Sequence, residues 1–329
     1  MKVLVTGVSG FVGGNLAREL LRQGYQVKGF LRPQSDRRNL AGLAVEPAYG
    51  DLRDAESVAR AVDGCDGVFH AAAAYTLWSR DPRSVYATNV EGTRNVLKAA
   101  LTKGVRKVVY TSTESTIAWG EDGCLAESKD HKGKYVPAGD YKRSKYQAEQ
   151  VAMDLGRQGL PVVVVNPTTP IGPGDLKPTP TGQIIVDFLN GRMPAYVNTG
   201  LNLIYVEDVV KGHILALEKG RAGERYVLGC RNVTFQNMLG MLEQITGLKA
   251  PSVRIPIWLA LGAAYVDEFA AKHVLKRPPR VPVAGVKTAR RFRFFDCSKA
   301  VQELGLPQTP IEEALEKSVR WFRENGYVR

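Results

Sequence analysis

The sequence predicts an α/β protein with a doubly wound parallel sheet and a second, smaller C-terminal domain. Two observations predict the sheet. Short valine-rich apolar runs alternate with amphipathic segments through the first half of the 329 residues, and a glycine-rich turn joins the first run to the first such segment. Continuous apolar runs are typical of strands that helices cover on both faces. A third observation predicts the second domain, because the alternation stops after Pro167. In such sheets, ligands bind at the carboxyl ends of the strands.

The predicted elements follow in order along the chain. Apolar runs predict strands at 2–7, 26–30, 67–73, 107–112 and 161–167. Helices are predicted at 15–24 and 89–104, each closed by a glycine, and from about Tyr141 onward. Segment 166–182 is rich in Pro, Gly and Thr and is typical of a long functional loop. Beyond it we expect a helix at 184–194, a strand and helix within 201–220, a strand at 224–229 and a helix at 311–326.

Composition and charge restrict the classes of partner. Hydrophobic residues make up 44% and charged residues 24%, as in globular proteins. The formal charge of +12 favours anionic partners, namely a phosphorylated ligand, an acidic membrane surface or nucleic acid. No secretory signal precedes the first strand, so we expect a soluble cytoplasmic protein. The nearly uncharged run 255–266 is too short to cross a bilayer and predicts a core or interfacial helix.

The cysteines and histidines show no metal-binding pattern. The cysteines stand far apart, at Cys65, Cys124, Cys230 and Cys297, and the histidines are His70, His131, His213 and His273. Neither set has the spacing of metal ligands, so we expect reduced thiols and no metal site.

Glycines stand at positions 7, 10 and 13 in the segment TGVSGFVGG, between the first strand and the first helix. Gly7 permits a tight turn, Gly10 lets a pyrophosphate approach the backbone, and Gly13 lets helix and strand pack closely. Amides at the N-terminus of the helix bind the phosphates. This spacing in this context predicts a Rossmann-type dinucleotide-binding domain.

The end of the second strand carries Arg32 where NAD-binding proteins have an acidic residue. An acid binds the ribose 2′-hydroxyl of NAD, whereas a guanidinium is suited to the 2′-phosphate of NADP. Arg37 and Arg38 follow closely, and Asp36 is the acid that a loop could swing inward. We therefore predict NADP, with NAD as the second choice. Asp51 is expected to accept from the adenine amino group or to cap the following helix.

These motifs divide the chain into two predicted domains. Residues 1–175 form the NAD(P)-binding domain, and the strand and helix within 203–230 return to it. Residues 176–329 form the smaller substrate-binding domain.

Tyr141 is the only one of 13 tyrosines that has a lysine, Lys145, four residues later. Positions i and i+4 share one face of a helix, so the phenol and the ammonium can enter one pocket. The ammonium would favour phenolate and lower the pKa of Tyr141, as proton transfer requires. The small residues 71–73 and the hydroxyl groups of Ser112 and Thr113 follow two strands at the same sheet edge.

Together, these motifs resemble the extended short-chain dehydrogenase/reductase family, which includes sugar nucleotide epimerases and dihydroflavonol reductases. The resemblance extends over most of the first 170 residues. The matching residues are Gly7, Gly10, Gly13, Asp51, Leu52, Asn89, Thr113, Tyr141 and Lys145. Segments 166–182 and 184–220 resemble the hopanoid-associated sugar epimerase subfamily of bacteria, and that resemblance extends over nearly the whole chain.

The resemblance implies a role for each residue of the pocket. Tyr141 is the general acid/base on an alcohol or carbonyl oxygen, Lys145 lowers its pKa and holds the nicotinamide ribose, and Thr113 hydrogen-bonds the substrate oxygen. Dehydrating relatives carry Thr-Asp-Glu where this chain has Thr113-Glu114-Ser115, so a 4,6-dehydratase is not expected. The predicted cofactor contacts are Gly7, Gly10, Phe11, Val12, Gly13, Arg32, Asp51, Leu52, Ala71, Ala72, Ala73, Thr111, Tyr141, Lys145, Pro167 and Thr168.

The implied function is that of an NAD(P)-dependent sugar epimerase or oxidoreductase. It moves hydride between the nicotinamide and an oxygen-bearing carbon of a sugar or lipid-linked polyol, in hopanoid side-chain metabolism. The alternatives are an NADPH-dependent carbonyl reductase of the dihydroflavonol-reductase type and a non-catalytic dinucleotide-sensing regulator. The intact Thr113, Tyr141 and Lys145 argue against the regulator. The resemblance also implies a homodimer that pairs through the helices carrying Asn89 and Tyr141.

The sequence allows more than one role for each of two further segments. Tyr75 and Trp78 line the floor of the substrate pocket or pack in the core. The basic stretch 272–293 is typical of a solvated face, with a substrate phosphate or peripheral contact with an anionic membrane as the alternatives. We expect no nucleic-acid binding, because charge is its only support.

Overall fold

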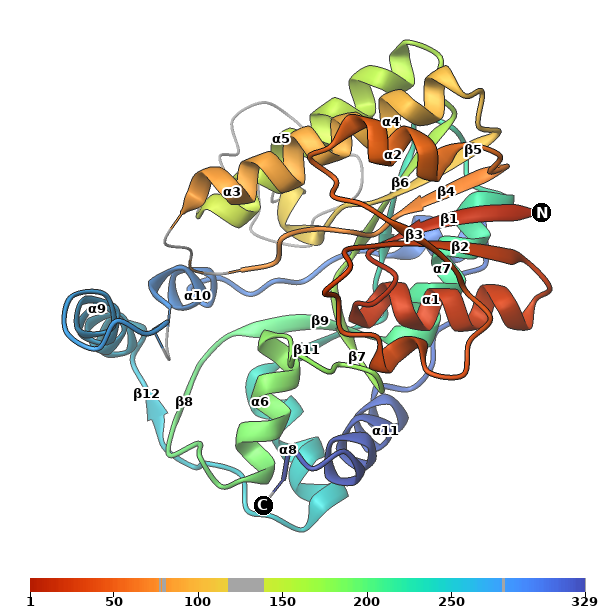
Figure 1. Cartoon of the computed structure of the whole chain (residues 1–329). Coiled ribbons are helices and arrows are strands. Elements are labelled where there is room, and N and C mark those ends of the chain that lie inside the picture. Colours follow the sequence, from red (N-terminus) through yellow and green to blue (C-terminus); the bar gives the residue numbers. More distant parts are fainter. Residues whose placement is uncertain (77, 79–80, 118–138, 280–281, 329) are drawn as a thin grey trace.

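The computed structural model describes residues 1–76, 78, 81–117, 139–279 and 282–328 (Figure 1). Seven strands form one sheet in which every neighbouring pair is parallel, in the order β10-β6-β5-β4-β1-β2-β3. The strands are β1 (Lys2–Thr6), β2 (Gln26–Leu31), β3 (Glu46–Tyr49), β4 (Gly67–His70), β5 (Lys107–Thr111), β6 (Val162–Pro167) and β10 (Arg225–Leu228). The doubly wound parallel sheet predicted from the sequence is confirmed.

Each strand of this sheet except β3 was predicted from the sequence. The sequence of β3 is EPAY, and its residues are exposed or half-buried because it lies at the edge of the sheet. An edge strand of this kind lacks the continuous apolar run that marks a buried parallel strand.

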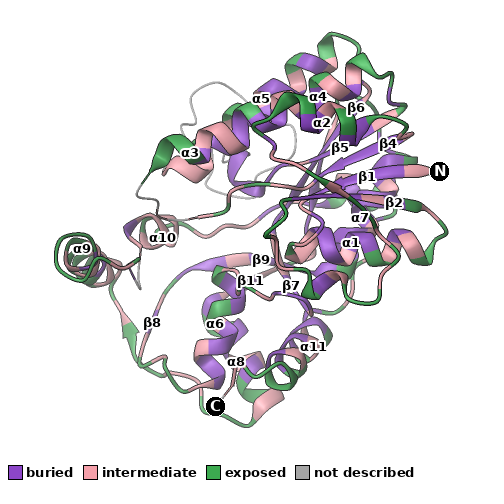
Figure 2. Cartoon of the chain, in the orientation of Figure 1, coloured by how far each residue is buried: buried purple, intermediate pink, exposed green. Residues whose placement is uncertain are grey.

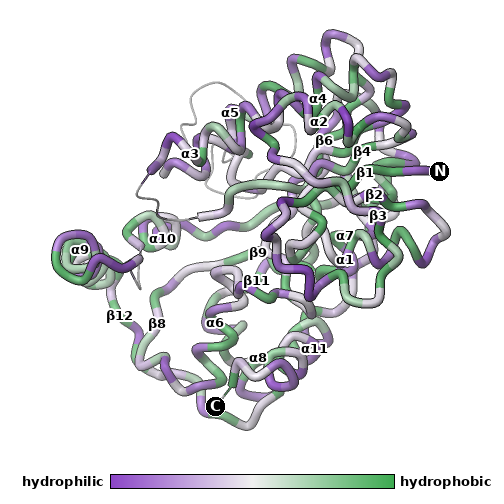
Figure 3. Tube along the Cα trace, viewed as in Figure 1, coloured by the Kyte–Doolittle hydropathy of each residue, from purple (hydrophilic) through white to green (hydrophobic). Residues whose placement is uncertain are grey.

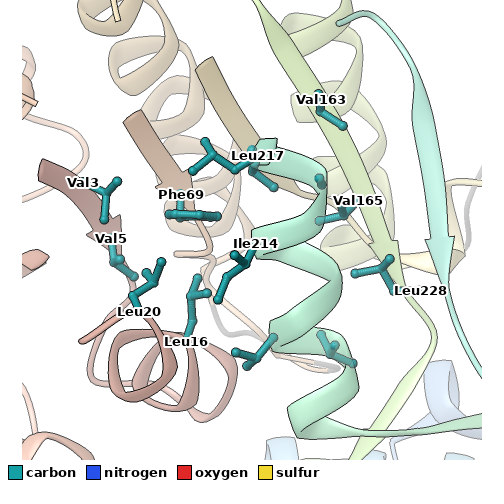
Figure 4. Close-up of a cluster of buried hydrophobic side chains, with 14 of the residues drawn as sticks. Val3, Val5, Leu16, Leu20, Phe69, Val163, Val165, Ile214, Leu217 and Leu228 are labelled. Carbon is teal, nitrogen blue, oxygen red and sulfur yellow. The ribbon is translucent and has the colours of Figure 1, made fainter. Parts of the chain in front are cut away.

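Helices cover both faces of the sheet (Figure 1). One layer contains α1 (Phe11–Arg22) and α7 (Val206–Glu218), and the other contains α2 (Ala55–Val62), α4 (Gly92–Thr102) and α5 (Asp140–Arg157). Figure 4 shows Leu16 and Leu20 of α1 beside Phe69 of the sheet and Ile214 of α7, all nearly or completely buried. Each such side chain contributes about 1.5–3 kcal/mol through burial, so this layer fixes α1 against the sheet.

The helix predicted at 89–104 has a different start in the structure. The short helix α3 (Pro82–Tyr86) leads into a π-helical turn, η2 (Ala87–Glu91), before α4 begins at Gly92. Asn89 is buried within this turn. Turns of this kind inside helices often occur at functional sites.

The remaining elements are two small sheets and the helices that follow them in the chain. A three-stranded sheet contains β7 (Thr169–Ile171), β9 (Gly200–Tyr205) and β11 (Arg231–Thr234), and a two-stranded sheet contains β8 (Tyr196–Val197) and β12 (Arg254–Ile255). The helices are α6 (Pro180–Leu189), α8 (Phe235–Thr246), α9 (Ile257–His273), α10 (Val283–Thr288) and α11 (Ile311–Glu324). Short helical turns lie at η1 (Arg38–Leu40), η3 (Glu114–Thr116) and η4 (Ala300–Leu304).

A separate apolar cluster joins α6, α8 and α11 to β9, with Phe322 and Met238 almost completely buried in it. The division of the chain into 1–175 with 203–230 and 176–329 stays a prediction. None of the described helices is long and apolar enough to cross a membrane.

Candidate active site

A cavity of about 1380 Å³ lies at the carboxyl ends of the sheet strands and extends toward α6, α8, α9 and α10. Every residue that we predicted for catalysis or cofactor binding lines this one cavity. The sequence motifs therefore converge in space, although they come from segments as distant as Gly7 and Thr168. Their individual roles stay predictions.

The glycine-rich turn is packed too tightly for side chains. Gly7 has a φ of +70°, and a Cβ there would lie 2.8 Å from the backbone of Ala72. A Cβ on Gly13 would lie 2.1 Å from the Gly7 carbonyl oxygen. Helix α1 begins at Phe11, and no side chain caps its N-terminus. Its first amides thus remain available to a phosphate at the cavity wall, so the turn fits a dinucleotide pyrophosphate.

Segment 166–182 closes over this turn. Asn39 donates to the carbonyl of Gly174 at 3.0 Å, and Asn15 of α1 donates to that of Pro173 at 3.0 Å. These two bonds hold the segment above the helix N-terminus. The segment predicted as a functional loop therefore forms one wall of the cavity.

The part of the cavity that we predict to hold the adenosine is lined by Arg32 and by two acids that form ion pairs. Asp36 pairs with Arg38 at 2.7 Å, and this partner lowers the pKa of Asp36 to about 2. Asp51 pairs with Arg53 at 2.7 Å, which lowers its pKa to about 2 as well. Helix α2 is capped by Asp54 and not by Asp51, so the capping alternative for Asp51 was wrong.

Lys145 projects from α5 toward Tyr110 and Thr111 at the end of β5, where it is buried. Its ammonium donates to Tyr110 Oη at 3.0 Å and to the carbonyl of Thr111 at 2.7 Å. Burial lowers the pKa of Lys145 to about 7, while the charge of Glu149 acts in the opposite direction. The contact of Tyr110 with Lys145 was not predicted from the sequence, because a tyrosine in the middle of an apolar strand indicates only core packing.

The environment of Tyr141 raises its pKa instead of lowering it. Burial moves this pKa well above its usual range, and the phenols of Tyr75 and Tyr110 add to the shift. The ring of Tyr75 meets that of Tyr141 edge-on, with centroids 4.7 Å apart. We predicted that Lys145 lowers the pKa of Tyr141, and this prediction was wrong. The ammonium of Lys145 is directed toward Tyr110 and Thr111 instead. Tyr75 thus belongs to the wall of the pocket.

Glu149, one further turn along α5, is completely buried in a polar network. It forms an ion pair with Arg225 of β10 at 2.7 Å. It also accepts hydrogen bonds from Ser112, from Thr116 at 2.6 Å and from Asn166 at 3.0 Å. The network fixes the face of α5 that carries Tyr141 and Lys145 against the ends of β5 and β6.

Thr113 is joined to the C-terminal part of the chain through Glu114. The hydroxyl of Thr113 donates to the Glu114 carboxylate, which forms an ion pair with Arg293. The side chains of Glu114 and Arg293 are only 10% and 15% exposed. Burial lowers the pKa of Arg293 to about 10. Sequence reasoning assigned Arg293 to a basic stretch and missed this role, because 179 residues separate the partners.

Asn89 connects the end of β4 to α5. Its side chain accepts from the amide of Ala74 at 2.7 Å and donates to the Ala74 carbonyl at 3.2 Å. It also donates to Ser144, the neighbour of Lys145, at 2.9 Å. The buried amide therefore positions the start of α5 relative to the cavity.

Two of the histidines are buried and have structural hydrogen-bond partners. His70 bridges Thr6 and Thr93, and His213 bridges Thr111 and the carbonyl of Val209. Burial lowers their pKa values to about 3 and about 4. Among the described residues there is no group of metal-binding side chains, while His131 and Cys124 lie outside them.

Comparison with known proteins identifies the family. Residues 3–229 match the family model described as "NAD dependent epimerase/dehydratase family". The chain belongs to this family. The match extends over the sheet, the glycine-rich turn and α5. The family predicted from the sequence is confirmed, and the protein is an NAD(P)-dependent enzyme of the extended short-chain dehydrogenase/reductase type.

Proteins with names that refer to different activities are similar to this chain over at least 95% of their length. A Synechocystis sp. protein named "Putative dihydroflavonol 4-reductase" is 48% identical over 99% of this chain and 95% of its own. "Sterol demethylase protein B" of Methylococcus capsulatus is 37% identical over 100% of both chains. A solved structure of a nucleoside-diphosphate-sugar epimerase from Pseudomonas aeruginosa has a TM-score of 0.83 at 26% identity, over 100% of this chain and 99% of its own.

Proposed function

We propose that the protein is an NADP-dependent oxidoreductase that interconverts a secondary alcohol and a ketone on an apolar, lipid-like substrate. The observation that carries this proposal is the apolar wall at the substrate end of the cavity. Its lining includes Ile184 of α6, Leu201 of β9, Phe235 of α8, Ile255 of β12 and Val286 of α10.

The charged residues at this end of the cavity are already engaged. The substrate end of the cavity excludes the glycine-rich turn and segment 166–182. Among the described residues, the cations that line this end are Lys142, Lys145 and Arg293. Lys142 donates to Thr288 at 2.7 Å, and Arg293 is paired with Glu114. A sugar diphosphate needs cations for its phosphates, so this lining favours a substrate without them.

The names of two relatives support the same substrate class. One name refers to a dihydroflavonol and the other to a sterol. Both are compact polycyclic molecules that carry oxygen. The hopanoid-linked polyol predicted from the sequence belongs to this class too. All three suggest an apolar ring system that fills the wall formed by α6, α8 and α10.

The residues of the site divide the proton chemistry between them. A nicotinamide dinucleotide, when bound, supplies or accepts the hydride. Tyr141 is protonated at neutral pH because its pKa is high, so it holds a proton for the substrate oxygen in the direction of reduction. Thr113 donates its own proton to Glu114, and its oxygen, which accepts from the amide of Ser115 at 3.3 Å, has one further acceptor site for a substrate hydroxyl. Lys145 lines the same cavity, and its pKa of about 7 means that only part of its population is charged at neutral pH.

Arg32 supports NADP as the cofactor. It lines the adenosine end of the cavity, and the acids nearest to it in sequence, Asp36 and Asp51, are occupied by Arg38 and Arg53. Arg32→Ala should weaken NADPH binding about 10-fold to 150-fold, as expected for one charged hydrogen-bonding group, and leave NADH nearly unchanged. Arg60→Ala, an exposed position on α2, is the matched control. Equal losses for both cofactors would contradict the assignment.

A sugar epimerase is the second candidate, favoured by the structural similarity to the Pseudomonas aeruginosa epimerase. The two functions differ in cofactor handling, because an epimerase regains its hydride within one turnover. The experiment is to denature the purified protein, identify the released cofactor, and then test exchange with added NADPH. Exchange with oxidation of NADPH by polycyclic ketones supports the reductase. Retained oxidised cofactor, with turnover of UDP-sugars and no net change in NADPH, would refute it.

We further propose a cytoplasmic homodimer. The described cysteines Cys65, Cys230 and Cys297 are free thiols, as in a reducing compartment. The family resemblance suggests pairing through α4 and α5, and light scattering of the purified protein tests it. A monomer at micromolar concentration would contradict this part of the proposal.

A further inference from the structure

Helix α9 carries an apolar stripe that the rest of the described chain leaves largely exposed. Only Ala264 and Ala271 of its 17 residues are buried. Trp258, Val266 and Phe269 are 69%, 71% and 65% exposed. Figure 1 shows α9 at the edge of the molecule, away from the central sheet, and Figure 2 shows its outer surface as exposed.

The exposed side chains share one face of the helix. At 100° per residue, positions 258, 259, 265, 266 and 269 fall within about one third of the helix circumference. The stripe therefore consists of Trp258, Leu259, Tyr265, Val266 and Phe269, and it continues past the helix into Val274 and Leu275. Figure 3 shows both hydrophobic and hydrophilic colouring on α9. A cluster of exposed large apolar side chains on one helix is typical of an interaction site.

Positive charges border the stripe, and the two acids of α9 are used internally. Asp267 pairs with Arg277 at 2.8 Å, and Glu268 accepts from the amide of Val283. The exposed cations on α9, on α10 and in the adjoining chain segments are Arg254, Lys272, Lys276, Lys287, Arg290 and Arg291, and the ammonium of Lys287 lies 5.5 Å from the ring centroid of Tyr265. Exposed aromatic and aliphatic side chains with lysines and arginines nearby are typical of surfaces that contact an anionic membrane.

The same helical pair reaches the substrate end of the cavity. Ala260 of α9 lines it, together with Gly285 and Val286 of α10. The apolar stripe and the apolar cavity wall are thus opposite sides of one structural unit. An apolar substrate that dissolves in a bilayer would pass from the lipid to Tyr141 across this unit without entering water.

We propose that α9 and α10 form a docking surface for an anionic lipid bilayer, through which the apolar substrate reaches the cavity. The inference rests on the proposed function for its substrate class. The docking itself is measured without turnover, so the two can fail separately.

The experiment is flotation of the full chain with vesicles of phosphatidylcholine containing 30 mol% phosphatidylglycerol, and with phosphatidylcholine alone. We expect binding to the anionic vesicles that weakens with salt. The stripe variant Trp258→Ser/Val266→Ser/Phe269→Ser should not float. The charge variant Lys272→Glu/Lys276→Glu should bind at least about 25-fold more weakly, since each cation near the surface contributes about fivefold.

Matched control variants show whether vesicle binding depends on the stripe and its neighbouring cations or on surface hydrophobicity and charge in general. Val301→Ser removes a partly exposed apolar side chain elsewhere, and Arg320→Glu/Arg323→Glu reverses two exposed charges on α11. Both should bind like the wild type. Circular dichroism and NADPH binding confirm that each variant is folded, and the charge variant tests docking even if the stripe variant fails to fold.

Three outcomes would overturn the inference. The first is that the wild type does not float with anionic vesicles. The second is that the stripe variant floats as well as the wild type. The third is that light scattering reveals a dimer that the stripe variant dissociates, in which case the stripe is a contact between two copies. Oxidation of NADPH by polycyclic ketones, measured without vesicles, tests the proposed function on its own.

Discussion

Removing one partner of the Glu114–Arg293 ion pair should destabilise the protein far more than removing both. Glu114→Gln keeps an oxygen that accepts from Thr113 but removes the charge that balances Arg293. Arg293→Met keeps the length of the side chain and leaves the carboxylate unbalanced. Both side chains are at most 15% exposed, so each single variant leaves an uncompensated buried charge.

The size of the effect follows from this burial. Breaking a buried ion pair from one side costs about 3–5 kcal/mol, whereas replacing the whole pair by uncharged groups is close to neutral. The double variant should therefore be more stable than either single variant, with a coupling energy of about 3 kcal/mol or more. An exposed pair has a coupling energy of about 0–1 kcal/mol.

The assay is a double-mutant cycle in urea, followed by circular dichroism, with the pair Arg231–Glu312 as control. That control pair also joins distant segments, at 2.6 Å, but its side chains are 52% and 46% exposed. We expect strong coupling in the buried pair and little in the control pair. Additive losses at Glu114 and Arg293, or equal coupling in both cycles, would refute the argument from burial.

Three other outcomes are expected. Tyr141→Phe should lower kcat by about 10²-fold to 10⁴-fold and leave NADPH affinity, measured by fluorescence, nearly intact; persistent turnover would contradict its role. Gly13→Ala should abolish NADPH binding in titrations, because its Cβ would lie 2.1 Å from the Gly7 carbonyl oxygen; unchanged binding would contradict the tight turn. Lys145 has a pKa of about 7 in the folded protein and about 10.4 unfolded, so the unfolded chain binds more protons between these values. Stability should therefore rise with pH across this window by up to about 1.4 kcal/mol per unit, and Lys145→Met should remove that slope. Equal slopes in the two proteins would contradict the buried ammonium.

Local patterns predicted those parts of the fold and site that depend on neighbours in sequence. The Gly7 turn, the strands of the sheet interior and the shared helix face of Tyr141 and Lys145 each arise from residues within about ten positions of one another. The physical reason is that backbone conformation and helical spacing are local properties. The sequence therefore placed the cavity-lining residues without knowledge of the tertiary structure.

Pairings between distant segments escaped prediction. Arg293 meets Glu114 across 179 residues, and Arg225 meets Glu149 across 76. Neither arginine has a local signal that distinguishes it from a solvated cation. The pKa of Tyr141 was predicted in the wrong direction for the same reason, because burial by the surrounding chain outweighs the charge of the one nearby lysine.

The order of strands in the sheet also determines when the domain can fold during synthesis. Strand β10 completes the sheet beside β6, yet the 57 residues between Pro167 and Arg225 are made between the two strands. At about 5–20 residues per second, on the order of 3–12 s separate the two strands during translation. Throughout this interval the nascent chain has β6 as an unpaired edge, and Glu149 lacks Arg225. Unpaired apolar edges promote aggregation, so we expect this stretch of translation to be the period in which chaperones protect the chain.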